Sequence, residues 1–177
     1  NEADAIYEGK AVKLMPLEGA EKLVIEGESF EAFNTSGGCA TMCETYADKV
    51  ENLTYKTIRY PGHLNHMKFL FNDLHLKKNK DILEKLFDKE VPRTKNDVII
   101  FFVKVIGLID GVLQEKTYLR KIYGNEKFSA IQLTTASGVC SVLKIFLDGK
   151  LNSKGFTKQE SLSWKDFLDN KFGEVYS

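Results

Sequence analysis

The segment Lys56–His63, with the sequence KTIRYPGH, contains a residue type suited to binding an anion. Arg59 is one of only three arginines in the chain, beside 22 lysines. The guanidinium group presents a rigid, planar set of donors that matches a carboxylate, whereas the lysine ammonium is a flexible point charge. We therefore predict that Arg59 binds a carboxylate. The alternative is an ordinary surface arginine at a strand end, paired with a nearby acid.

A second candidate is the glycine-centred turn that follows a strand-like run. It consists of Asn34, Thr35, Ser36, Gly37 and Gly38. Hydroxyl groups and accessible backbone amides at the start of a helix suit a carboxylate or a carboxamide. The simpler interpretation is that Thr35 or Ser36 only caps the following helix and that the glycines only turn the chain. Both interpretations stay open.

His63 directly follows the Pro61-Gly62 turn and is the candidate for proton transfer. Imidazole titrates near neutral pH, so it could accept or donate a proton in a reaction. The alternative is a residue that merely begins a helix. His63 and His66, or Cys39 and Cys43, have spacings found in metal sites, but each pair lacks a matching second pair. We therefore predict no metal.

The elements that would hold these residues follow from the apolar pattern. Short strands with turns at Gly9, Gly19 and Gly27 are expected in the first thirty residues. The pattern then predicts strands over Phe30–Phe33 and Leu53–Tyr60 and helices over Leu64–Leu74 and Asp81–Glu90.

The second half begins with a predicted hairpin. Val98–Ile106 is nearly continuously apolar, which is typical of a strand covered on both faces. Asp110-Gly111 is a two-residue turn signal, and Val112–Tyr123 should return as the partner strand. Ser129 and Gln132 have the spacing of a capping box, which opens a helix running to Asp148. A polar connector over 151–160 and a short helix within 162–172 complete the chain.

These elements predict an α+β fold with a mostly antiparallel or mixed β-sheet and helices on one face. The 177 residues carry 25 basic and 25 acidic side chains, a balance that argues against a nucleic-acid or membrane partner. No uninterrupted apolar run approaches the ~20 residues that span a bilayer. Three cysteines are an odd number for a disulfide framework, so we expect a reducing, cytoplasmic location.

Four strings in order carry a family resemblance: FEAFNTSGG, KTIRYPGH, VPRT and AIQLTTASGV. Together they resemble the C-terminal, substrate-side domain of saccharopine dehydrogenase-type oxidoreductases, in particular that of bacterial saccharopine and lysine 6-dehydrogenase-like proteins. The resemblance covers nearly the whole chain. It implies a fold like the C-terminal domain of glyceraldehyde-3-phosphate dehydrogenase, a homodimer formed through this domain, and an amino-acid substrate held by Arg59, the Asn34–Gly38 turn, Tyr60 and Thr134.

Two of these residues have a simpler interpretation. Tyr60 could be an ordinary aromatic side chain of the sheet, and Thr134 could belong to a helix face that packs tightly against it. The fungal saccharopine reductases have a Pro-Asn-Arg-type string near the position of Asn34-Thr35-Ser36. This chain lacks that arginine, which favours a smaller amino acid over saccharopine.

The chain has no G-x-G-x-x-G motif with an acidic residue ~20 positions later, so it lacks the dinucleotide-binding signature. We expect an excised domain, with 1–150 forming the substrate-binding and dimerisation part. Residues 151–177 would pack near the missing nucleotide domain of the same polypeptide. NAD or NADP would bind that domain, and none is expected on this chain alone. The alternative is a non-catalytic oligomerisation or amino-acid-sensing module.

Overall fold

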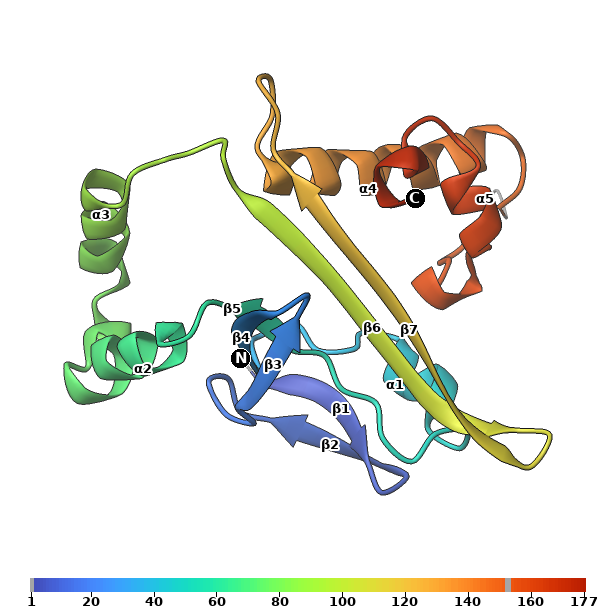
Figure 1. Ribbon diagram of the computed structural model, residues 1–177, viewed down its shortest axis with the longest axis horizontal. Helices are drawn as coiled ribbons and strands as arrows, with labels where there is room; N and C mark the ends of the chain where they lie inside the picture. Colours follow the sequence, from blue (N-terminus) through green and yellow to red (C-terminus); the bar gives the residue numbers. More distant parts are fainter. Residues whose placement is uncertain (1, 152–153) are drawn as a thin grey trace. The chain divides into compact units, whose positions relative to one another are not determined.

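The computed structural model describes residues 2–151 and 154–177. It forms two compact units, Asn1–Pro92 and Arg93–Ser177, a boundary that the sequence did not predict. Within the predicted connector over 151–160, residues 152–153 lie outside the described part. Each unit is described by itself (Figure 1).

The fold is α+β, as predicted, but its strands form three small antiparallel sheets instead of one larger sheet. The first unit holds the pair β1–β2 and the three-stranded sheet β3–β4–β5, and the second unit holds the pair β6–β7. Their bounds are β1 Ala3–Tyr7, β2 Lys10–Leu14, β3 Glu21–Ile25, β4 Glu28–Phe33, β5 Thr57–Arg59, β6 Val98–Ile109 and β7 Val112–Tyr123. The expectation of one sheet covered by helices on one face is therefore wrong in its arrangement.

Two tight turns shape the first unit. Glu8-Gly9 joins β1 to β2 with φ values of 48° and 73°, and Glu26-Gly27 joins β3 to β4 with 51° and 83°. Positive φ at both central residues is the conformation that matches the twist of a two-residue hairpin. The predicted turns at Gly9 and Gly27 are confirmed.

The core of the first unit forms where β1 meets α1, Met42–Tyr46. Ile6, Cys39 and Cys43 are buried together, and burial raises the pKa of the Cys39 thiol to about 11. A thiol with so high a pKa is almost wholly protonated near neutral pH, so it is a poor nucleophile. All three cysteines are free thiols.

The α1 helix begins later than the sequence indicated. Its N-cap is Thr41, whose side chain makes no capping hydrogen bond. The prediction that Thr35 or Ser36 caps this helix is therefore wrong, because 36–41 form turns before the helix starts. The predicted strand over Leu53–Tyr60 is also shorter than expected, since Leu53 only bridges to Ile6 and pairing resumes at β5.

The remaining helices of the first unit are short. The predicted helix over Leu64–Leu74 is found as α2 followed by a π-helical turn, and the helix predicted over Asp81–Glu90 is confirmed as α3. Their bounds, with a short 3₁₀ turn between them, are α2 His63–Lys68, π turn Phe69–Asp73, 3₁₀ turn Leu76–Lys78 and α3 Lys80–Glu90.

The second unit is a long hairpin with helices at one end. β6 and β7 pair over twelve residues each, and the Asp110-Gly111 turn has φ values of 51° and 78°. The predicted hairpin is confirmed, with β6 three residues longer than expected. Figure 1 shows the turn end of the hairpin extending away from the helices of this unit.

The long helix α4, Ala130–Leu147, has the predicted capping box: Ser129 Oγ accepts from Gln132 N, and Gln132 Oε1 accepts from Ser129 N. The Asp97 carboxylate adds further acceptors for Ala130 N at 2.7 Å and Ile131 N at 3.3 Å. Four of the N-terminal amides of a helix lack partners within it, so these contacts fix where α4 begins.

The C-terminal elements pack on α4 and the hairpin. Tyr176 Oη donates to Thr134 O at 2.6 Å, and the Tyr118 hydroxyl donates to Tyr176 O. The rings of Phe101 and Phe167 lie 5.4 Å and 5.2 Å from that of Tyr176. The bounds are 3₁₀ turn Gln159–Ser161, α5 Trp164–Leu168 and 3₁₀ turn Gly173–Tyr176, so the predicted helix within 162–172 is shorter than expected.

Among the described residues, α4 is the one helix long and apolar enough to cross a membrane by length and composition. It has 18 residues and a mean hydropathy of 1.5. One such helix is weak evidence for a membrane span, because the core helix of a soluble protein meets the same criteria; 28% of the α4 residues are buried. The absence of a membrane partner stays a prediction.

Candidate functional site

A carboxylate from β4 organises the turn that follows β5. Glu31 lies directly opposite Arg59 in the β4–β5 register. The Glu31 carboxylate accepts hydrogen bonds from Leu64 N at 2.6 Å and Gly62 N at 3.2 Å. Gly62 has a φ of 97°, a conformation in which glycine carries no steric cost. The turn that carries His63 is thus tied to the middle strand of the sheet.

His63 lies against an apolar ring. Its imidazole stacks on Phe33, with ring centroids 6.1 Å apart and an angle of 19° between the planes. Partial burial lowers the pKa of His63, and the positive charge of Arg59 lowers it further, while Glu31 acts in the opposite direction. Near neutral pH the imidazole is therefore mostly unprotonated, which is the form that can accept a proton.

Arg59 and Tyr60 present their side chains to solvent. Arg59 Nη1 donates to Ile58 O at 2.9 Å, and among the described residues no acidic side chain forms an ion pair with Arg59. The Tyr60 ring tilts over Phe30 with centroids 5.5 Å apart. The guanidinium group therefore has donors that remain available to an anion from solution.

The Asn34–Gly38 turn is partly structural. Asn34 is 3% exposed, and its backbone pairs with Leu17 N and Glu18 O at 2.8 Å and 2.9 Å. Its Oδ1 is buried without a hydrogen-bond partner among the described residues. Gly38 packs on β1, since a Cβ there would lie 2.5 Å from Asp4 N. Thr35 is half-buried, whereas Ser36 and Gly37 are exposed.

Thr134 lies on α4 in the second unit and is described within that unit. It is 4% exposed, and its hydroxyl donates to Ala130 O at 2.8 Å and Ile131 O at 3.3 Å. This hydroxyl is satisfied within its own helix, which fits the packing alternative for that residue.

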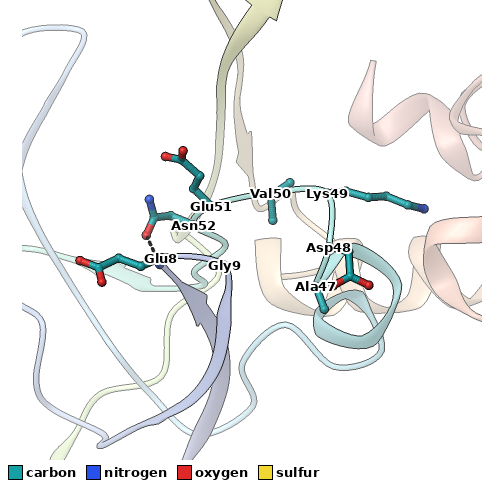
Figure 2. Close-up of a pocket in the computed structure, with 8 residues that line it drawn as sticks. All are labelled: Glu8, Gly9, Ala47, Asp48, Lys49, Val50, Glu51 and Asn52. Carbon is teal, nitrogen blue, oxygen red and sulfur yellow. Dashed lines mark hydrogen bonds between the residues drawn. The ribbon is translucent and has the colours of Figure 1, made fainter.

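The candidate residues do not line either of the two depressions described next. One depression of about 660 Å³ is lined by Glu8, Gly9 and residues 47–52. Figure 2 shows that its charged side chains point in different directions and do not converge on a common point. A second depression, also about 660 Å³, lies along α4 and is mainly apolar, with Val139, Leu143 and Phe156 among its lining residues.

Within the described residues, no three His, Cys, Asp or Glu side chains come together as metal ligands. The sequence reasoning missed Glu31 and Phe33, which orient the turn and the imidazole. A glutamate and a phenylalanine two residues apart in a strand give no signal of such roles, because only the β4–β5 register shows what they face.

A comparison with known protein families finds no family model that matches this chain. The structure is an α+β fold in which Arg59, exposed, and His63, partly buried, lie at the end of strand β5 of a three-stranded sheet.

The geometry around His63 predicts how its protonation should respond to its neighbours. In an NMR titration, His63 should titrate below the ordinary value of about 6.5. Arg59→Ala should raise the pKa of His63 because it removes a nearby positive charge, and Glu31→Gln should lower it further. A depressed pKa means that the unfolded chain binds more protons, so His63 makes the folded state gain stability as pH rises from the lowered folded value to about 6.5.

Lys68→Ala serves as the matched control for the removal of a positive charge. Lys68 lies on α2, the same helix as His63, but it is not among the causes that shift the pKa of His63. A His63 titration midpoint that does not respond to Arg59→Ala would contradict the arrangement described here.

Proposed function

We propose that this chain is the substrate-binding and dimerisation domain of an NAD(P)-dependent oxidoreductase of the saccharopine or lysine dehydrogenase type. In the complete enzyme, hydride would pass between the nicotinamide and the carbon of a substrate CH–NH group. The nucleotide would bind a separate Rossmann domain of the same polypeptide. The four sequence strings that resemble this family support the proposal, and two of them fall in the cluster around Arg59.

The observation that carries the proposal is the juxtaposition of Arg59 and His63. Arg59 lies opposite Glu31 in the β4–β5 register, and the Glu31 carboxylate holds the turn that carries His63. Oxidation of an amino acid at its amine needs a group to hold the carboxylate and a group to accept a proton from nitrogen. A guanidinium group that forms no ion pair among the described residues, together with a mostly neutral imidazole, would supply these two chemical functions.

The substrate is proposed to be an amino acid with one carboxylate near the reacting amine. One arginine can hold one carboxylate through two parallel hydrogen bonds. The Asn34–Gly38 turn contributes no second arginine, so a molecule with several carboxylates is less well matched than a smaller amino acid. Among the described residues, the buried Asn34 Oδ1 has no hydrogen-bond donor.

Arg59→Ala tests the proposal in a protein that joins this chain to its nucleotide-binding domain. The variant should raise the KM for the amino acid by roughly 10- to 100-fold, because a charge-assisted bond to a carboxylate contributes about 1.5–3 kcal/mol. Steady-state kinetics with NAD and NADP and a panel of amino acids would measure it. An unchanged KM would show that Arg59 is not the carboxylate ligand.

Arg120→Ala is the matched control. Arg120 is also an exposed strand arginine, and its Nη1 donates to the carbonyl of the preceding residue, as that of Arg59 does. Its removal should leave KM unchanged. Calorimetric titration of the 177-residue chain alone with the same amino acids provides a second readout. Tight binding without any nucleotide domain would favour an amino-acid-sensing module over the enzyme domain.

A further inference from the structure

The short helix α2 has no side-chain cap of its own. Its N-cap is Gly62, which has no side chain, and His63 is its first residue. The first amides of a helix lack partners within it, and a helix of six residues is marginally stable by itself in water. A group outside α2 that binds these amides would therefore fix the position of His63.

Glu31 is that group, although it lies 31 residues before Gly62 in the sequence. Its Oε1 accepts a hydrogen bond from Leu64 N at 2.6 Å, and its Oε2 accepts one from Gly62 N at 3.2 Å. Hydrogen bonds to an ionised carboxylate are stronger than those between neutral groups. Because each oxygen binds a different amide, the two bonds restrain the orientation of the turn as well as its distance from β4.

The turn is anchored on both sides of His63. His63 N donates to Tyr60 O at 3.3 Å, and the next residue, Leu64, is 5% exposed. The imidazole stacks on Phe33, and residues two apart in a strand, such as Glu31 and Phe33, lie on the same face of a sheet. Strand β4 therefore contacts the backbone of the turn through Glu31 and the ring of His63 through Phe33.

We propose that Glu31 is the positioning residue for proton transfer by His63: its carboxylate holds the start of α2 so that the imidazole stays on the sheet face that carries Arg59. Arg59 lies directly opposite Glu31 in the β4–β5 register, so these two side chains share that face. The inference rests on the proposed function for the reaction, whereas the hydrogen bonds that carry it belong to this chain alone.

Kinetics of a protein that joins this chain to its nucleotide-binding domain test the proposal. Glu31→Ala removes both acceptors and should lower kcat roughly tenfold or more, because proton transfer depends on the placement of the base. Arg59→Ala should instead act mainly on KM. These two substitutions thus separate the placement of the base from the binding of the carboxylate.

Glu31→Gln separates position from charge. The glutamine keeps one oxygen acceptor for the turn, so kcat should fall less than in Glu31→Ala. It removes a negative charge that favours protonated His63, so the acid limb of the kcat/KM profile should move to lower pH. A merely structural role would lower the active fraction of the protein without moving this limb.

The 177-residue chain gives a readout that needs no catalysis. Hydrogen exchange at the Leu64 amide should be roughly tenfold faster or more in Glu31→Ala, because a charge-assisted hydrogen bond is lost. NMR contacts between the rings of His63 and Phe33 should weaken in the same variant.

The matched controls are Glu21→Ala and Glu21→Gln. Glu21 is a carboxylate of β3 in the same sheet, pairs with Lys56 at 3.3 Å, and is not among the groups that shift the pKa of His63. Both substitutions should leave the exchange of the Leu64 amide and the acid limb of the pH profile unchanged.

Unchanged exchange at Leu64 in Glu31→Ala, or an acid limb that does not move in Glu31→Gln, would overturn the role of Glu31. A complete protein that oxidises no amino acid with NAD or NADP would instead overturn the proposed function. In that case, the exchange and the ring contacts of the 177-residue chain would still decide whether Glu31 positions His63.

Discussion

Gly38→Ala should destabilise the first unit by about 3 kcal/mol or more. Gly38 has a φ of 63°, which costs any other residue roughly 1–2 kcal/mol. An added Cβ would also lie 2.5 Å from Asp4 N and 2.7 Å from Asp4 O. Those atoms belong to strand β1, so relief would require the turn and the strand to separate. Urea unfolding followed by hydrogen exchange of the β1 amides would measure the loss.

Gly9→Ala separates the two causes. Gly9 has a similar φ of 73°, but a Cβ there meets nothing within 4 Å. Its replacement should cost only the conformational part, roughly 1–2 kcal/mol. Equal effects of Gly9→Ala and Gly38→Ala would contradict the close approach of Gly38 to β1.

Asn170→Ala should destabilise the second unit by about 2–4 kcal/mol. The Asn170 Oδ1 accepts from Ser141 Oγ at 3.1 Å, Phe172 N at 3.1 Å and Gly173 N at 3.2 Å. Ser141 is fully buried on α4, so the variant leaves its hydroxyl without a partner away from water. The same side chain therefore holds the C-terminal turn to the helix.

The chain offers a local probe for this variant. Trp164 is the only tryptophan, and it contacts Phe167 and Tyr118 with ring centroids 5.2 Å and 5.7 Å away. Its fluorescence during urea unfolding should shift to a lower midpoint in Asn170→Ala. Asn125→Ala is the control, because Asn125 Oδ1 also accepts from two backbone amides but in an exposed loop, and it should cost about 1 kcal/mol. A midpoint shift no larger than that of the control would show that Asn170 does not hold the unit together.

Local sequence signals predicted the elements that depend on local chemistry. The Asp110-Gly111 turn and the Ser129–Gln132 capping box were both found where the sequence placed them, since a turn of positive φ and a reciprocal cap are set by a few adjacent residues. The class α+β followed from the mixture of these elements.

What the sequence could not predict depends on register and packing. The helix expected right after Gly38 begins at Met42, because Gly38 and Cys39 first pack against Asp4. The role of Glu31 also stayed hidden, since a carboxylate finds the amides of Gly62 and Leu64 only after β4 and β5 have paired. Arg59 and His63 were singled out by residue type, and their relation to each other came from the fold.

Asp97 has a consequence for how the two units are joined. The backbone carbonyl of Asp97 accepts a hydrogen bond from Gly124 N, and its carboxylate accepts one from Ala130 N at the start of α4. The hydrogen-bonded structure of the second unit therefore begins at Asp97. In the first unit, α3 ends with a hydrogen bond from Val91 N to Phe87 O. The residues between, 92–96, are all exposed and contain no helix or strand. This exposed segment without helix or strand is where a protease should cut the chain first.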